Sequence, residues 1–75
     1  MLRLLTVAQL RVGIAGYGVI GKRRRLCVDA NAHLTTVAVC DKKFSDDGHL
    51  DDGVAYSQSY SKLFDHDLDA VLVCM

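Results

Sequence analysis

A glycine-rich turn set between two apolar segments constrains this chain more than any other feature. A short apolar run at residues 12–15 is followed, with the spacing GxGxxG, by Gly16, Gly18 and Gly21. In a βαβ unit the first such glycine permits a tight turn, the second lets the backbone approach a ligand closely, and the third lets a helix pack near the strand. A second apolar run follows and ends in an acidic residue. This order predicts a strand, a helix and a second strand of the doubly wound type.

The same arrangement predicts a site for a dinucleotide. The free N–H groups near Val19 and Ile20, in the first turn of the expected helix, would face a pyrophosphate, where the helix dipole favours negative charge. Asp41 ends the second apolar run, residues 34–40, and lies twenty positions after Gly21. This matches the usual spacing of about 20 for the carboxylate that accepts hydrogen bonds from the adenosine ribose. A glycine turn in another kind of α/β unit is the alternative that the motif leaves open.

The basic run at residues 22–25 is interpreted first as a solvated helix surface and second as an aid in attracting phosphates. No interleaved aromatic residues accompany it and the formal net charge is zero, so no nucleic-acid partner is expected. Arg25 stands where a small residue usually lets the helix lie against the sheet. We expect either a helix rotated so that this side chain extends to water or looser packing. The helix face expected to be buried consists of Val19, Ile20, Leu26, Cys27 and Ala30.

The polar segment at residues 42–53 contains Gly48 and Gly53, which predicts a loop or a short helix. Its four aspartates surround His49, but their spacing matches no calcium loop and the chain contains no glutamate, so no metal site is predicted. Three cysteines without a CxxC pair favour a reducing compartment, so a cytoplasmic location is expected. The apolar runs are far shorter than the 18 or so residues that span a bilayer, which predicts no membrane segment.

Three further elements are expected after this segment. Residues 54–56 fit a short third strand, and residues 60–64 fit a helix with Leu63 and Phe64 facing the sheet. Residues 70–75 are apolar without alternation, which suits a parallel strand buried on both faces, and the doubly wound order places it beside the first strand.

The predicted fold class is therefore α/β, a partial Rossmann sheet of about three to four parallel strands with flanking helices. Residues 1–10 are expected to be an N-terminal extension, and residues 11–75 a truncated dinucleotide-binding domain. A complete domain of this type has six strands in two halves, and this chain supplies about half of that.

Three stretches carry a resemblance to a known family: GIAGYGVIGKR, LTTVAVCD and YSQSYSKLFDHDLDAVLVCM. They resemble the N-terminal part of the glucose–fructose oxidoreductase, inositol dehydrogenase and rhizopine catabolism (Gfo/Idh/MocA) family, whose members show an AGxGxIG turn, a V-A-V-x-D strand and a strand ending VCTPN. The resemblance covers about residues 11–74. It implies a nicotinamide-dependent oxidoreductase that passes hydride between its cofactor and a sugar, a cyclitol or a related polyol.

The resemblance also implies cofactor-binding roles for single residues. The residues implied to line the pyrophosphate turn are Gly16, Tyr17, Gly18, Val19, Ile20 and Gly21. Asp41 would hold the adenosine ribose, Lys42 would flank it, and Cys74 would sit at a strand end near the cofactor. Asp41 favours NAD because a carboxylate repels a 2′-phosphate, but Lys42 and Lys43 partly offset this repulsion and leave NADP open. Cys40 and Cys74 are otherwise interpreted as small buried hydrophobic residues.

Departures from the family pattern limit the expected activity. Met75 stands in place of a threonine, and the family's glutamate-lysine-proline motif and substrate domain are not in this sequence. No catalytic residue is therefore predicted, and the chain alone is expected to be inactive. The alternatives are an archaeal-type glyceraldehyde-3-phosphate dehydrogenase parent, a non-catalytic nucleotide-binding module, and an interaction fragment that forms oligomers through an exposed strand at residues 70–75.

Overall fold

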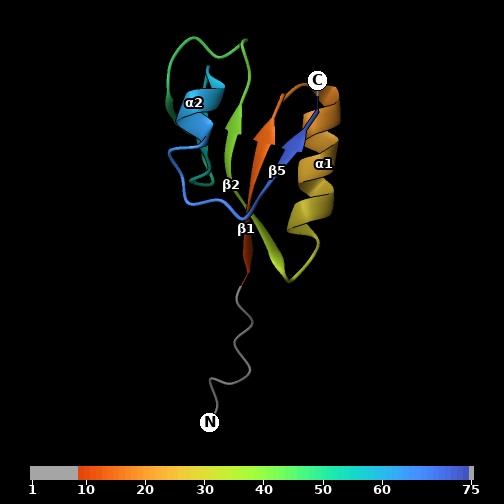
Figure 1. The fold of residues 1–75 in the computed structure, drawn as a ribbon. Coiled ribbons are helices and arrows are strands. Elements are labelled where there is room, and N and C mark those ends of the chain that lie inside the picture. The colour runs from red at the N-terminus through yellow and green to blue at the C-terminus, as the bar shows by residue number, and fades with distance from the viewer. Residues whose placement is uncertain (1–8, 75) are drawn as a thin grey trace.

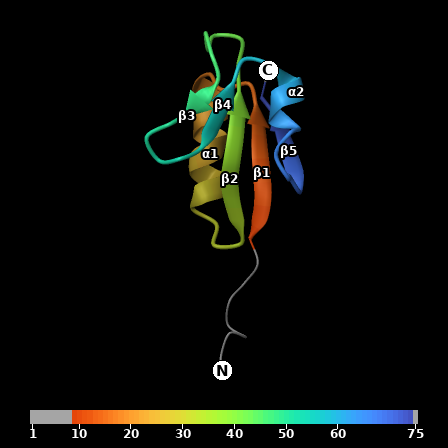
Figure 2. The same cartoon turned by 90° about the vertical axis from the view of Figure 1, so that its left-hand side faces the viewer.

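The computed structural model describes residues 9–74, which form a five-stranded sheet in the order β3-β4-β2-β1-β5. The strands that run parallel are β1 (Leu10–Ala15), β2 (Leu34–Cys40), β4 (Ala55–Ser57) and β5 (Ala70–Val73). A short strand, β3 (Gly48–His49), pairs antiparallel with β4. The helices α1 (Val19–Asp29) and α2 (Tyr60–Leu63) lie on opposite faces of the sheet (Figures 1 and 2). The predicted α/β class with a Rossmann-like, mostly parallel sheet is confirmed.

The two faces of the sheet are packed differently. On the α1 side, larger side chains such as Ile14 and Val39 are fully buried together with Val28 of the helix. On the α2 side the strands contribute mainly small residues, among them Ala15 and Ala38, around the fully buried Leu63. Small residues let a helix lie close to a sheet, so α2 buries a leucine with a single turn. The cores on both faces centre on β1 and β2. The glycine turn follows β1, and the acidic residue Asp41 follows β2.

The expected buried face of α1 is wrong. Val19 and Ile20 are exposed, Leu26 is 72% exposed, and Cys27 and Ala30 are also exposed. The buried residues of the helix are Gly21 and Val28. The helix therefore turns toward the sheet a side that is not its most apolar one. The cause is the close approach at Gly21, where an added Cβ would lie 2.0 Å from the carbonyl oxygen of Gly16. This contact fixes the rotation of the helix about its axis.

The chain between β2 and β4 forms turns and the two-residue strand β3, without a helix. After β4, the Ser59 hydroxyl accepts a hydrogen bond from the backbone N–H of Lys62 and caps α2. Leu63 faces the sheet as predicted, but Phe64 is 62% exposed, and the prediction for it is wrong. A helix of one turn directs few side chains at the sheet, and Phe64 is already its C-cap residue.

The last strand, β5, pairs with β1 in parallel as predicted, with Val12 opposite Ala70 and Ala15 opposite Val73. It lies at the edge of the described sheet, and Val73 is 68% exposed, so the expectation of burial on both faces is wrong. Strand β1 begins at Leu10, inside the expected extension, whose residues 1–8 lie outside the described residues, as does Met75. Neither helix within residues 9–74 has the length and apolar character needed to span a membrane.

Candidate functional site

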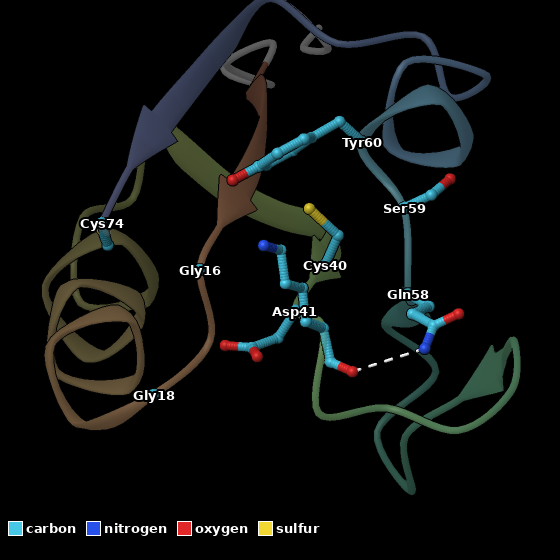
Figure 3. Close-up of a pocket in the computed structure, with 9 residues that line it drawn as sticks. Gly16, Gly18, Cys40, Asp41, Gln58, Ser59, Tyr60 and Cys74 are labelled. Carbon is cyan, nitrogen blue, oxygen red and sulfur yellow. Dashed lines mark hydrogen bonds between the residues drawn. The ribbon is translucent and has the colours of Figure 1, made fainter.

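A pocket of about 520 Å³ opens at the carboxyl ends of the parallel strands. The residues that line it are Gly16, Gly18, Cys40, Asp41, Lys42, Gln58, Ser59, Tyr60 and Cys74. They come from the glycine turn, the end of β2, the segment between β4 and α2, and the end of β5, and the Tyr60 ring extends from α2 across the pocket (Figure 3). Ligands of open α/β sheets bind in the crevice outside the carboxyl ends of the strands.

The glycine turn has a different geometry at each of its three glycines. Gly16 has a φ of 98°, a conformation that residues with a side chain rarely adopt. At Gly18 an added Cβ would meet no atom within 4 Å, so the backbone borders open space. At Gly21 the space is closed by the Gly16 carbonyl. The turn therefore needs glycine at 16 and 21 for its own folding, while the bare backbone at 18 faces the pocket.

The N-terminus of α1 points its first N–H groups toward the turn. Gly18 is the N-cap residue, no side chain caps the helix, and the first turn contains no acidic residue. The intrahelical ladder starts with the N–H of Lys22, which donates to the carbonyl of Gly18 at 3.0 Å. The preceding N–H groups and the helix dipole favour an anion at this end. Val19 and Ile20 do not line the pocket with their side chains, so any role they have there is through the backbone.

Asp41 is held in place by two backbone donors. Its Oδ2 accepts from the N–H of Tyr17 at 2.7 Å, and its Oδ1 accepts from the N–H of Lys43 at 3.0 Å. The hydrogen bond from Lys43 is the largest cause that holds the pKa of Asp41 below its usual value. Burial opposes it, and the hydrogen bond from Tyr17 and the charges of Lys43 and Lys22 add to the lowering. The side chain is therefore ionised at neutral pH. A carboxylate offers about four lone-pair positions, so Asp41 keeps acceptors for two further donors such as the hydroxyls of a ribose.

Tyr17 lies behind the turn rather than in the pocket. Its side chain is buried in the α1-side core, and its ring stacks on Phe44 with 6.4 Å between the ring centroids. Its hydroxyl accepts a hydrogen bond from Nη1 of Arg25 at 3.1 Å. Of the nine residues predicted for the site, Tyr17, Val19, Ile20 and Gly21 do not line the pocket, and the other five do.

Arg25 does not extend into water, so the first of the two arrangements expected for it is wrong. Its side chain is 14% exposed, and its guanidinium contacts Tyr17, Asp29 and Asp52. Desolvation opposes the charge, but the hydrogen bonds outweigh it and raise the pKa of Arg25. The other cations of the basic run, Lys22, Arg23 and Arg24, are exposed as expected for a solvated surface.

Besides Cys40, which was interpreted as a small buried residue, three residues of the pocket were not predicted from the sequence: Gln58, Ser59 and Tyr60. The signal that could have found them is their position directly after a parallel strand, since such segments reach the same edge of the sheet. Gln58 also joins the two walls, because its side-chain amide donates to the carbonyl of Lys42 at 3.5 Å.

The two cysteines of the pocket differ in exposure. Cys40 is buried, and burial raises the pKa of its thiol, as expected of a small hydrophobic residue. Cys74 is partly exposed at the rim, where its N–H donates to the carbonyl of Ala15 at 2.7 Å. Within residues 9–74, no three His, Cys or Asp side chains are grouped closely enough to hold a metal ion.

Comparisons of the chain with protein-family models, with curated proteins and with solved structures found no match. What supports a function is therefore the chemistry of the pocket, together with the resemblance of the three sequence stretches described above.

Proposed function

We propose that the pocket binds a nicotinamide dinucleotide, with NAD favoured over NADP. The observation that supports this most is the meeting of three features around one pocket: the open backbone at Gly18, the uncapped N-terminus of α1, and the ionised carboxylate of Asp41. The first two suit a pyrophosphate, and the third suits a ribose diol. The pocket volume of about 520 Å³ lies within the usual range for small-molecule sites.

The preference for NAD follows from charge. Asp41 is fixed by two backbone N–H groups, so it cannot easily turn away from a 2′-phosphate placed against it. Lys42 at the rim and Lys43 beside it are exposed, where solvent and salt weaken their attraction for a phosphate. The fixed anion is therefore expected to outweigh the two exposed cations.

We further propose that the chain is the cofactor-binding part of an oxidoreductase of the Gfo/Idh/MocA type. The support is the resemblance of the glycine turn, of the second strand ending in Asp41 and of the last strand. In such an enzyme the bound cofactor exchanges hydride with a sugar, a cyclitol or a related polyol. The described residues are assigned the tasks of holding the pyrophosphate and the ribose, with Cys74 at the strand end beside the cofactor, and none is assigned a catalytic role.

Titration of the 75-residue chain with NADH and NADPH, followed by cofactor fluorescence and by thermal stability, tests this proposal. Asp41→Asn is expected to weaken NADH binding about tenfold, equivalent to about 1.4 kcal/mol, and to affect NADPH less. Asp51→Asn is the matched control, because Asp51 is an exposed aspartate outside the pocket and the variant loses the same charge. A folded chain that binds neither cofactor, or that loses affinity equally in both variants, would refute the proposal.

A further inference from the structure

The side chain of Arg25 contacts residues in three parts of the protein: α1 itself, the glycine turn and the turn before β4. Its Nε lies 3.0 Å from Oδ2 of Asp29, one turn further along α1. A second nitrogen contacts Asp52 in the turn before β4, and the third, Nη1, donates to the hydroxyl of Tyr17 at 3.1 Å. All the terminal nitrogens of a mostly buried arginine are therefore committed to defined partners.

Tyr17 is held at both of its ends. Its side chain is buried, stacks on Phe44, and carries the Nζ of Lys22 5.8 Å from the ring centroid. Its backbone N–H donates to the Asp41 carboxylate at 2.7 Å. Tyr17 is thus hydrogen-bonded at both ends, to Arg25 through its hydroxyl and to Asp41 through its backbone N–H.

This double hold matters because Tyr17 stands between two glycines. Gly16 and Gly18 have the widest backbone freedom of any residue type, so the conformation of the turn depends on the contacts around it. Tyr17 supplies the side chain within the stretch 16–18, and anchoring it restricts the turn. A turn that is ordered before the ligand arrives loses less entropy when it binds.

We propose that Arg25 is a positioning residue for the pocket, acting through Tyr17 to fix the glycine turn and the Asp41 carboxylate in the geometry that receives a ribose and its pyrophosphate. The identity of the ligand in this proposal rests on the proposed function, whereas the claim that Arg25 orients the Asp41 carboxylate does not. The competing explanation is that Arg25 only braces α1 against the turn at Asp52, in which case its loss would lower stability and leave the pocket unchanged.

Two variants separate these explanations. Arg25→Met removes every contact of the guanidinium. Tyr17→Phe removes only the tyrosine hydroxyl and keeps both the stacked ring and the positive charge of Arg25. Arg24→Met is the matched control, because Arg24 is an exposed arginine of the same helix and its loss changes the net charge equally. Should Arg25→Met fail to fold, Tyr17→Phe still carries the test.

The first measurement is the pKa of Asp41 without cofactor, from a carbon-detected NMR titration of the side-chain carboxyl. We expect Arg25→Met and Tyr17→Phe to raise this pKa, since the Tyr17 N–H would no longer be held on the carboxylate, and Arg24→Met to leave it at the wild-type value. An unchanged pKa in folded Arg25→Met and Tyr17→Phe would overturn the proposal.

The second measurement is the ratio of the NADH and NADPH dissociation constants in the same proteins. The two test variants should weaken NADH roughly three- to tenfold, the effect of losing a hydrogen bond of ordinary net strength, and NADPH less. An unchanged ratio of the two dissociation constants would contradict the positioning role and leave Arg25 only the role of stabilising α1 against the turn at Asp52. If wild-type chain binds neither cofactor, the proposed function fails, while the pKa of Asp41 still decides whether Arg25 positions the carboxylate.

Discussion

Two glycines of the same motif should respond to the same substitution in opposite ways. At Gly21 an alanine Cβ would lie 2.0 Å from the carbonyl oxygen and 3.0 Å from the carbonyl carbon of Gly16. Both are backbone atoms, so the helix and the turn must separate. At Gly18 the Cβ would meet nothing within 4 Å, and the φ of −88° is allowed for alanine.

The magnitudes follow from these contacts. Overpacking of this kind costs up to about 3 kcal/mol, and alanine returns about 1 kcal/mol in a helix, so Gly21→Ala should lose about 2 kcal/mol of unfolding free energy. For a domain of this size that lowers the Tm by roughly 8–16 °C. Gly18→Ala should stay within about 1 kcal/mol of wild type, because the reduced freedom of the unfolded chain offsets the poorer helix cap.

The assay is urea denaturation followed by circular dichroism, combined with NADH titration of each folded variant. Gly18→Ala should weaken NADH at least tenfold, since its methyl group enters the space where the pyrophosphate is proposed to approach the backbone. Wild-type stability in Gly21→Ala would refute the close packing of α1 on the turn. Wild-type NADH affinity in Gly18→Ala would refute the placement of the pyrophosphate.

Three further predictions concern packing, pH and thiol reactivity. Leu63→Ala should cost about 2–5 kcal/mol because the side chain is fully buried, whereas Phe64→Ala should cost less than about 1 kcal/mol, as urea midpoints will show. Because the pKa of Asp41 is lowered in the folded state, the stability it provides is complete above the unfolded-state pKa of about 4 and is lost as the pH falls through the folded value. Urea midpoints measured down to pH 2 should therefore decline less steeply for Asp41→Asn than for wild type, and an equal decline would contradict this. Ellman's reagent should modify the exposed Cys27 before the buried Cys40, whose thiol has a raised pKa, and mass spectrometry of the partly labelled chain will identify the order.

The part of the fold that was predictable from sequence is the part fixed by backbone chemistry. The glycine spacing and the two apolar runs predict β1, α1, β2 and their parallel order, because few other structures accommodate that pattern. The parallel pairing of β5 with β1 follows from the same connectivity. Asp41, one of the residues predicted for the site, lines the pocket because its position depends only on where β2 ends.

The errors concern features set by tertiary contacts. The rotation of α1 depends on the approach of Gly21 to Gly16, which the apolar side chains of the helix do not report, so Leu26 was assigned to the wrong side. Arg25 was expected either to extend into water or to loosen the packing, and its contacts with Tyr17 and Asp52 were not foreseen because only the tertiary fold brings these residues together. Gln58, Ser59 and Tyr60 follow β4 and lie near Asp41 in the pocket. They belong to no recognisable motif, so only the order of the strands in the sheet brings them to the site.

The most direct test of the central claim is an NMR titration of uniformly ¹⁵N-labelled chain with NADH, which reports each backbone amide separately. We predict that the largest shifts fall on Gly16, Gly18 and Val19 at the glycine turn, on Asp41, and on Ser59 across the pocket. Saturable shifts confined to these amides would support cofactor binding at the carboxyl ends of the strands. Saturable shifts that leave the glycine turn and Asp41 unchanged, or no shifts in a folded chain at millimolar NADH, would contradict it.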